Sequence, residues 1–390
     1  MRYIPRTLAG PLKKAAPHFP VLILTGPRRS GKTTLLRRCF PQASYHLLED
    51  PDIVGRVRSD PRTFLDAVRL PAILDEIQNV PELLNYIRSR VDLRGKKGGG
   101  WYLTGSQEPA LMKDVSESMA GRAAVFQLLP LSLAETARVT LLKGGFPEVL
   151  ARPAIAEVWF RSYIQTYLER DVRSISSIRD LTTFRRFLFL AASRIGQTLN
   201  RSDLAAPLGV SVPTISEWLN ILEATHQILL VPPYFENFGK RLVKSPKLYF
   251  ADTGLAAHLL GLESERMLDK SPFLGALFES FVASEIAKSQ IHAGKRKELF
   301  FFRDRQGLEV DFLIPGSGRR LILAEAKATR TVWPEAAESL IRLKKAIAGY
   351  TVDAVLVHLG GGTGPIFTSV RPGVRAATVA DLARMISGCK

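Results

Sequence analysis

Cysteine is scarce in this sequence, with Cys39 and Cys389 the two cysteines among 390 residues. Two thiols cannot supply a disulfide framework or a cysteine-based zinc site, and this usage fits a reducing compartment. Long apolar runs are also missing, since no stretch approaches the roughly 18 residues that a membrane helix needs. The N-terminus lacks an apolar segment followed by small cleavage-site residues. We therefore expect a cytoplasmic protein that is neither exported nor embedded in a membrane.

Acidic residues are absent from positions 1–40, which hold nine Lys or Arg. Over the whole chain 54 basic residues stand against 37 acidic ones, a formal net charge of +17. This excess favours an anionic partner, and we expect nucleic acid, DNA ahead of RNA. Part of the charge falls in the glycine-rich motif at residues 26–33, and a solvated basic surface without a specific ligand is the alternative.

The glycine-rich motif matches G-x-x-x-x-G-K-[ST] in full at residues 26–33. The apolar run at 21–24 predicts a buried parallel strand before the motif, and residues 32–40 are typical of a helix after it. Backbone N–H groups of such a loop bind polyphosphate, its lysine reaches the β- and γ-phosphates, and its hydroxyl ligates Mg²⁺. A glycine-rich turn before a surface helix is the competing interpretation, which the strand, loop and helix context disfavours. The residues assigned to ATP here, with Thr33 also an Mg²⁺ ligand, are Gly26, Pro27, Arg28, Arg29, Ser30, Gly31, Lys32, Thr33 and Thr34.

Two carboxylates end a second apolar stretch, at residues 71–76. We expect Asp75 to hold Mg²⁺ through a water from a strand neighbouring the phosphate loop, and Glu76 to polarise the attacking water. Helix-capping acids on the surface are the alternative. A third strand near residues 101–104 ends in polar side chains, and Thr104 and Ser106 are candidates to sense the γ-phosphate or to orient the water. Arg122 either stabilises charge on the transferred phosphoryl group or forms a structural salt bridge, and both alternatives stay open.

The motifs in residues 21–150 resemble those of a known family. They are the LTGSQ turn at 103–107, MAGR at 119–122, LLPLSLAE at 128–135 and GGFPE at 144–148. With these motifs the chain resembles, over nearly its whole length, the bacterial and archaeal AAA-type (AAA_14) ATPases that carry a DUF4143 C-terminal region. The resemblance implies an ASCE-type P-loop core with a parallel sheet.

The middle of the chain, residues 151–260, reads as helical. Aromatic residues at helical spacing between 159 and 188 indicate a core rather than a base-stacking stripe, and Arg161, Arg170, Arg173, Arg179, Arg185 and Arg186 give this section a basic outer face. Residues 202–224 predict a helix-turn-helix with Leu204, Val210, Ile215 and Leu219 in its core, and residues 228–234 with 247–250 a wing. Because the exposed face of the second helix lacks Arg and Lys, we expect no sequence-specific reading. The unit either contacts DNA phosphates, through Lys240, Arg241, Lys244 and Lys247, or serves as a packing module.

The C-terminal part, residues 261–390, holds a second polar constellation. A helix carries Glu279, a hairpin carries Asp311, and a strand ends in Glu325 and Lys327. This order resembles the PD-(D/E)xK nuclease fold. The resemblance implies that Glu279, Asp311 and Glu325 bind Mg²⁺ and that Lys327 positions or activates the attacking water. Glu309 is placed to replace or assist Asp311.

Three readings of this constellation stay open: an active nuclease, a nuclease fold without activity that binds a protein partner, and routine surface charges. The predicted fold class is therefore α/β with three domains: a P-loop ASCE/AAA-type parallel sheet domain at 1–150, a helical and winged-helix region at 151–260, and a PD-(D/E)xK-like α/β domain at 261–390. Formation of a homo-oligomer is a further open expectation.

Overall fold

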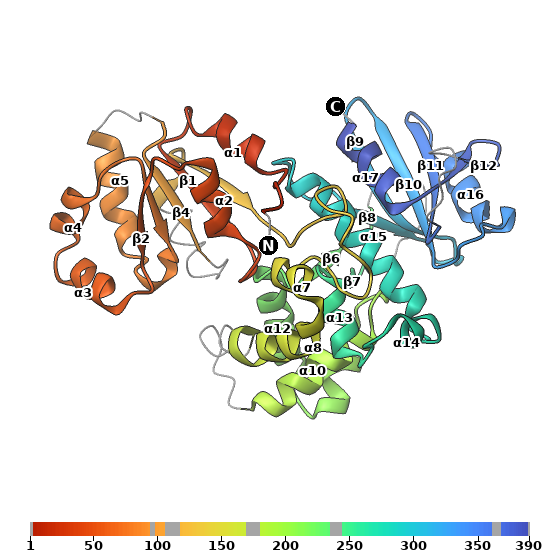
Figure 1. Cartoon of the computed structure of the whole chain (residues 1–390). Coiled ribbons are helices and arrows are strands. Elements are labelled where there is room, and N and C mark those ends of the chain that lie inside the picture. The colour runs from red at the N-terminus through yellow and green to blue at the C-terminus, as the bar shows by residue number, and fades with distance from the viewer. Residues whose placement is uncertain are drawn as a thin grey trace. The chain divides into compact units, whose positions relative to one another are not determined.

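The computed structural model describes residues 3–93, 98–105, 118–168, 180–234, 244–360 and 368–388. It divides into two compact units (Figure 1). The first contains Met1–Pro130 with the short segments Ala224–His226 and Ile291–Lys295, and the second contains Leu131–Glu223, Gln227–Gln290 and Arg296–Lys390. This grouping places the middle and C-terminal regions in one unit, and the three domain boundaries expected from the sequence stay a prediction.

The first unit is built from α1 (Ala9–Ala15), β1 (Val21–Thr25), α2 (Lys32–Cys39), β2 (Ser44–Leu47), α3 (Pro51–Ser59), α4 (Pro61–Ala67), β3 (Ala72–Asp75), η1 (Ile77–Asn79), α5 (Leu83–Leu93), β4 (Trp101–Thr104) and β5 (Ala123–Gln127). The second unit is built from α7 (Pro147–Ala151), η2 (Pro153–Ile155), α8 (Ala156–Tyr163), η3 (Ile164–Leu168), α10 (Leu181–Ser193), α11 (Arg201–Ala205), η4 (Ala206–Leu208), α12 (Val212–Ala224), β6 (Ile228–Val231), β7 (Lys247–Phe250), α13 (Thr253–Leu259), α14 (Glu265–Asp269), α15 (Leu274–Ile291), β8 (Phe300–Arg303), β9 (Glu309–Gly316), β10 (Arg320–Lys327), η5 (Pro334–Ala337), α16 (Glu338–Ala346), β11 (Thr351–His358), β12 (Thr368–Arg371), β13 (Val374–Ala377) and α17 (Val379–Gly388).

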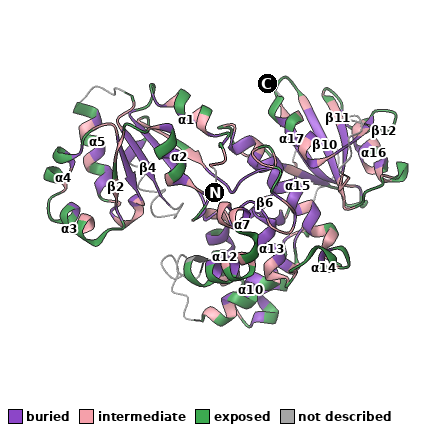
Figure 2. Cartoon of the chain, viewed as in Figure 1, coloured by how far each residue is buried: buried purple, intermediate pink, exposed green. Residues whose placement is uncertain are grey.

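The sheet of the first unit has five parallel strands in the order β2-β3-β4-β1-β5. Side chains of β1 alternate between two cores: Val21 and Ile23 pack with α3, α4 and α5, while Leu22 and Leu24 pack with α1 and α2. Because helices cover both faces, the strand reads as a continuous apolar run, as the sequence predicts. Figure 2 shows this buried centre.

The strand order separates the two strands that carry the nucleotide motifs, although Asp75 contacts Thr33 of the phosphate loop, as expected. The strand that ends in Asp75 is not a direct neighbour of the strand before the phosphate loop, because β4 lies between β1 and β3. The carboxyl ends of parallel strands meet at one edge of a sheet. Thr104, at the end of β4, therefore lies at the same edge of the sheet as the phosphate loop and Asp75.

The middle region confirms the interpretation of its aromatic residues as core. Phe160, Tyr163, Phe184 and Phe187 are buried, with exposed fractions of 2% or less. Their neighbours Arg161, Arg185 and Arg186 are exposed, in agreement with a basic outer face. The other predicted members of that face, Arg170, Arg173 and Arg179, lie outside the described residues.

The elements expected after residue 200 are present. Helices α11 and α12 flank a turn at Gly209, and β6 pairs with β7 in an antiparallel two-stranded sheet. Leu204, Ile215 and Leu219 are buried, whereas Val210 is half-buried. The cap of α11 is Asn200, whose side chain accepts the N–H groups of Ser202 and Asp203. Lys240 and Arg241 lie outside the described residues.

The C-terminal sheet is mixed, in the order β12-β13-β11-β10-β9-β8. Strands β8, β9 and β10 pair in an antiparallel manner, which confirms the expected hairpin, and β11 runs parallel to β10. One face packs against α16 through Leu340 and Leu343. The chain is thus an α/β protein with a parallel five-stranded sheet, a helical middle and a mixed C-terminal sheet. No helix in the described ranges is long and apolar enough to cross a membrane.

Helix α15 is buried along most of its length and carries a charged pair. Lys288 Nζ lies 3.0 Å from Glu285 Oε1 and donates to the Leu131 carbonyl at 3.1 Å. Glu285 also accepts the N–H of Leu133 at 2.7 Å. Residues 131–133 are therefore anchored to α15 by a buried ion pair whose charges also interact with the backbone groups of Leu131 and Leu133.

We expect Lys288→Met to lower the stability of the second unit by roughly 3–5 kcal/mol, because it leaves the Glu285 carboxylate buried without its counter-ion. Lys270→Met, which makes the same change at an exposed position, should stay within about 0.5 kcal/mol of wild type. Urea unfolding followed by circular dichroism measures both. Equal midpoints for the two variants would contradict a structural role for the pair.

Candidate nucleotide site and a buried carboxylate cluster

The backbone conformation of the phosphate loop favours glycine at both glycine positions of the motif. Gly26 has φ +141°, and a Cβ there would lie 2.3 Å from the carbonyl oxygen of Leu128. Gly31 has φ +100° and forms the N-cap of α2. Side chains other than hydrogen are strained in both conformations. The loop therefore curls from the end of β1 into the N-terminus of α2, where N–H groups and the helix dipole favour an anion.

Two buried basic residues lie at the loop. Lys32 Nζ donates to the carbonyls of Gly26 and Pro27, both at 3.0 Å. Arg6 donates to the carbonyl of Ser30 at 2.8 Å and to that of Leu129 at 2.6 Å. Arg6 thus supports the loop from the basic N-terminal part of the chain, ahead of the motif. Because Arg6 lies far from the motif in the sequence, no motif predicts its contact with the loop.

Ser30 gives a separate indication of what the loop binds. Its Oγ is buried and has no hydrogen-bond partner among the residues that the structure describes. A buried hydroxyl without a partner is costly unless a ligand satisfies it. The phosphate oxygens of a nucleotide are suitable acceptors for this hydroxyl.

Asp75, at the end of β3, is surrounded by hydroxyl groups. Thr33 Oγ1 lies 3.0 and 2.9 Å from its two carboxylate oxygens, Tyr45 Oη donates at 2.7 Å, and Thr104 Oγ1 also donates. Burial, together with the hydrogen bond to Asp75, raises the pKa of Tyr45 well above its usual range. Tyr45 lies on the neighbouring strand β2, and no motif in the sequence indicates its contact with Asp75.

Thr33 and Asp75 fit Mg²⁺. A hydroxyl and a carboxylate are hard oxygen ligands of the kind that this ion prefers, and they are already in direct contact. They are the residues that would hold the ion beside the phosphate loop. The remaining hydroxyls, from Tyr45 and Thr104, fix the orientation of the carboxylate.

Glu76 follows in a left-handed backbone conformation, with φ 61° and ψ 51°. Its N–H donates to Thr104 Oγ1 at 3.1 Å, and its carboxylate accepts from Gln78 Nε2 and lies 3.8 Å from Arg28 Nη1. Non-glycine residues adopt this conformation at a cost and often do so at functional sites. The carboxylates of Glu76 and Asp75 have different side-chain partners, in line with two different roles.

Arg122 lies at the amino ends of the strands, opposite the ends that carry the phosphate loop and Asp75. It directly precedes β5, whose first residue Ala123 pairs with Val21 at the start of β1. Its guanidinium donates to both carboxylate oxygens of Asp92, at 2.7 and 2.8 Å. Of the two alternatives, the salt bridge is the one present, and Arg122 does not reach the phosphate loop of its own chain. Ser106 lies outside the described residues.

The four residues of the second constellation are brought together. Lys327 Nζ lies 2.8 Å from Glu325 Oε1, and the N–H of Ala326 donates to Asp311 Oδ2 at 3.0 Å. Asp311 and Glu279 both contact one further residue, Lys247 of β7. Lys247 Nζ lies 2.9 Å from Glu279, 2.6 Å from Glu309 and 3.3 Å from Asp311. We call Lys247, Glu279, Glu309 and Asp311 the lysine–carboxylate cluster.

The expectation that Lys247 contacts DNA phosphates is wrong. Lys247 is 2% exposed, and its ammonium points into the lysine–carboxylate cluster. Tyr249, two residues further on the same strand face, donates to Glu279 at 2.5 Å. A lysine and a tyrosine on one face of an otherwise apolar strand were the available signal for this contact.

Burial and like charge act on the carboxylates around Asp311. Burial, and then the charge of Asp311, raise the pKa of Glu325 to about 7, against the opposing effect of Lys327. The same two causes raise the pKa of Glu279. Glu325 Oε2 is buried without a hydrogen-bond partner in the described part of the chain.

These carboxylates do not fit a metal ion. Within the described residues, no three His, Cys, Asp or Glu side chains are arranged so that they could hold one. The Lys247 ammonium lies among the oxygens of Glu279, Glu309 and Asp311. The predicted grouping of Glu279, Asp311, Glu325 and Lys327 is therefore found, but the expected Mg²⁺-binding role of its carboxylates does not agree with this geometry.

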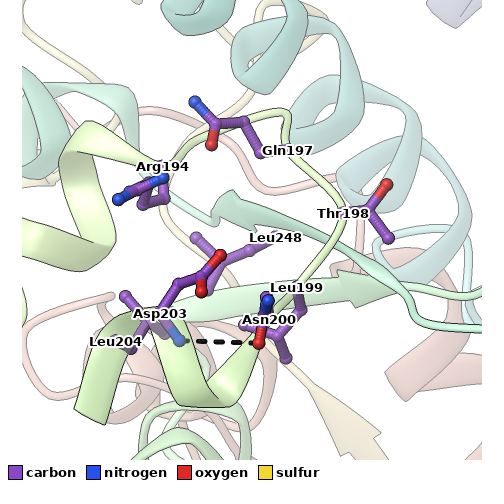
Figure 3. A pocket seen from close by; sticks show the side chains of 8 residues that line it. All are labelled: Arg194, Gln197, Thr198, Leu199, Asn200, Asp203, Leu204 and Leu248. Carbon is purple, nitrogen blue, oxygen red and sulfur yellow. Dashed lines mark hydrogen bonds between the residues drawn. The ribbon is translucent and has the colours of Figure 1, made fainter. Parts of the chain in front are cut away.

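A small pocket lies beside β7 at the start of α11 (Figure 3). Its volume is about 40 Å³, and its lining is formed by Arg194, Gln197, Thr198, Leu199, Asn200, Asp203, Leu204 and Leu248. Ligand pockets for small organic molecules measure about 300–1,000 Å³. The pocket is suited to water and not to a nucleotide.

The phosphate loop, the parallel sheet and the Thr33–Asp75 contact define a P-loop nucleotide-binding domain. Family models match three consecutive parts of the chain: an AAA domain (AAA_14) over residues 18–137, a domain of unknown function (DUF8612) over 134–266, and a domain of unknown function (DUF4143) over 274–369. The first and third matches confirm the resemblance seen in the sequence.

Other proteins are similar to this chain over most of its length. The uncharacterized protein Rv2008c of Mycobacterium tuberculosis (strain ATCC 25618 / H37Rv) is 32% identical over 323 residues, which cover 80% of this chain and 72% of the relative. The uncharacterized protein MJ1544 of Methanocaldococcus jannaschii is 22% identical, over 77% of this chain and 74% of the relative. The Walker-type ATPase PABY2304 of Pyrococcus abyssi has a solved structure that is 17% identical, covers 65% of this chain and 94% of that chain, and aligns with a TM-score of 0.44. The chain belongs to the family of the mycobacterial protein, with an AAA-type P-loop ATPase domain at its N-terminal end.

Glu325 predicts a pH dependence. Because its pKa rises from an ordinary 4.5 to about 7 on folding, the folded chain holds a proton that the unfolded chain releases between these values. Stability therefore falls as the pH rises through this window, by about 3 kcal/mol from this group. Glu325→Gln should weaken the fall between about pH 4.5 and pH 8 in urea unfolding, whereas exposed Glu338→Gln should leave it unchanged. Parallel curves for wild type and Glu325→Gln would rule out the shift.

Proposed function

We propose that the N-terminal domain binds and hydrolyses ATP with Mg²⁺. The observation that carries this proposal is the direct contact between Thr33 of the phosphate loop and Asp75 at the end of β3. Lys32 binds the β- and γ-phosphates, Thr33 and Asp75 hold Mg²⁺, and Glu76 polarises the attacking water. When bound, Mg²⁺ supplies positive charge to the phosphates.

Three further residues position this machinery in the proposed mechanism. Arg6 holds the loop through the Ser30 carbonyl, and Tyr45 orients Asp75. Thr104 contacts both acidic residues, since it donates to the Asp75 carboxylate and accepts the Glu76 N–H. A change at the γ-phosphate that moved Thr104 would be transmitted to both, which supports a sensing role for this threonine.

Two substitutions separate binding from hydrolysis. We expect Lys32→Ala to weaken ATP binding at least about tenfold, because a charge-assisted hydrogen bond is worth roughly 1.5–3 kcal/mol. Glu76→Gln should keep ATP binding and lower the hydrolysis rate by about 10²–10⁴-fold, because the amide cannot accept a proton from water. Fluorescent-nucleotide titration and phosphate release measure the two effects.

Lys14→Ala is the matched control, because Lys14 is an exposed lysine of the same unit. It should resemble wild type in both assays. ATP binding by Lys32→Ala at wild-type strength would disprove the assignment of the loop.

We also propose that the partner is nucleic acid, DNA before RNA, bound through its phosphates. The excess of 54 basic over 37 acidic residues supports an anionic partner, and Arg185, Arg186 and Lys244 are exposed in the helical middle region. The exposed face of α12 carries Pro213 and Glu217, Ser211 directly precedes the helix, and no residue of α12 is basic. This composition favours binding without sequence preference. A protein partner is the rival proposal.

A salt titration distinguishes the two partners. Affinity for duplex DNA should fall steeply with salt, with a log–log slope of about −0.9 for each phosphate contacted. The double variant Arg185→Ala/Arg186→Ala should make this slope shallower, whereas Arg342→Ala/Lys345→Ala on the exposed side of α16 should not. No binding to duplex DNA, single-stranded DNA or RNA at low salt would favour the protein partner.

For the C-terminal region we infer a PD-(D/E)xK-like arrangement without a catalytic metal. The order of Glu279, Asp311, Glu325 and Lys327 and their convergence support the likeness. The ammonium of Lys247 among the carboxylates supports the version in which nuclease activity is lost. In that version the region serves the ATPase as a binding module.

A further inference from the structure

The lysine–carboxylate cluster draws its residues from three elements. Lys247 comes from β7, Glu279 from α15, and Glu309 and Asp311 from β9. The side chain of Lys247 is 3% exposed, and those of Glu279, Asp311 and Glu309 are 19%, 12% and 31% exposed. The ammonium is therefore buried among carboxylates that are only partly exposed.

The three carboxylates provide one acceptor for each N–H of the Lys247 ammonium group. An ammonium group has three N–H donors, and Lys247 Nζ has one carboxylate oxygen from each of three residues at 2.9, 2.6 and 3.3 Å. Burial alone would lower the pKa of Lys247, but the charges of Glu279, Asp311 and Glu309 raise it above its usual range. Lys247 therefore stays protonated.

A divalent metal would need the same oxygens. Metal–oxygen bonds to Mg²⁺ or Ca²⁺ are about 2.0–2.6 Å long, so an ion shared by these carboxylates would occupy the position of the ammonium. Two further oxygens have other partners: Asp311 Oδ2 accepts the Ala326 N–H, and Glu309 Oε2 lies 3.4 Å from Arg303 Nε. Glu279 Oε1, which contacts Lys247, also accepts from Tyr249. Lysine and metal are thus mutually exclusive occupants.

We propose that Lys247 acts as a tethered cation that takes the place of a divalent metal in the carboxylate centre of the C-terminal region. The wild-type chain accepts no metal there, and shortening residue 247 creates a divalent-cation site. This inference rests on the proposed PD-(D/E)xK-like reading and is independent of ATP hydrolysis.

Equilibrium dialysis of the full chain against Mn²⁺, without nucleotide, tests the proposal. Wild type should bind no more Mn²⁺ than Asp311→Asn. Lys247→Ala should bind one additional Mn²⁺ per chain, which Lys247→Ala/Glu279→Gln should lose. Lys247→Met is the volume control: it removes the charge but keeps a side chain in the space, so it should gain no ion. Lys244→Ala removes an exposed lysine nearby and should match wild type.

Three results would overturn the proposal. The first is an Mn²⁺ ion bound by wild type and lost in Asp311→Asn, a comparison that decides the matter even where Lys247→Ala does not fold. The second is a folded Lys247→Ala chain without the additional ion. Cleavage of labelled DNA or RNA by wild type in Mn²⁺, abolished in Asp311→Asn, would also contradict it. ATP hydrolysis is measured in parallel and reports separately on the N-terminal domain. A chain that does not hydrolyse ATP would contradict the proposed function of that domain without affecting the interpretation of Mn²⁺ binding.

Discussion

A carboxylate taken out of water has to be compensated, and the two polar centres of this chain meet that requirement in opposite ways. Asp75 is satisfied by the hydroxyls of Thr33, Tyr45 and Thr104, which are neutral donors. Its negative charge is stabilised but not cancelled, so it keeps its attraction for a cation. In the lysine–carboxylate cluster the compensation is a full positive charge from Lys247. The Asp75 centre can therefore bind a metal cation, whereas the lysine–carboxylate cluster already contains the ammonium cation of Lys247.

The nucleotide site could be predicted from the sequence because most of its information is local. The strand, loop and helix at residues 21–40 are contiguous, and the backbone geometry at Gly26 and Gly31 follows from one motif. Asp75 and Glu76 were identifiable because acids at the end of a buried strand lie at the ligand-binding edge of a parallel sheet. The hairpin bearing Asp311 was equally local, since alternation and a turn specify it.

Contacts between distant segments explain what the sequence did not reveal. Arg6 and Tyr45 join the nucleotide site from other elements, and no spacing relates them to the motif. The role of Arg122 stayed open because the order of strands along the chain does not give their order in the sheet. Its position directly before β5 nevertheless indicates the amino ends of the strands, away from the phosphate loop. Lys247 was misread because a basic residue in a wing suggests phosphate contact, whereas only the fold shows that its strand face meets α15 and β9.

The same cluster bears on how the second unit is organised. Lys247 lies in the part that matches DUF8612, whereas Glu279, Glu309 and Asp311 lie in the part that matches DUF4143. Separating the two parts would leave three partly buried carboxylates without their counter-ion and a buried ammonium without its acceptors, and each uncompensated charge is strongly destabilising. The boundary between the two family models therefore does not separate two parts that are each stable alone. The middle and C-terminal regions depend on each other through a charge balance that neither part completes alone.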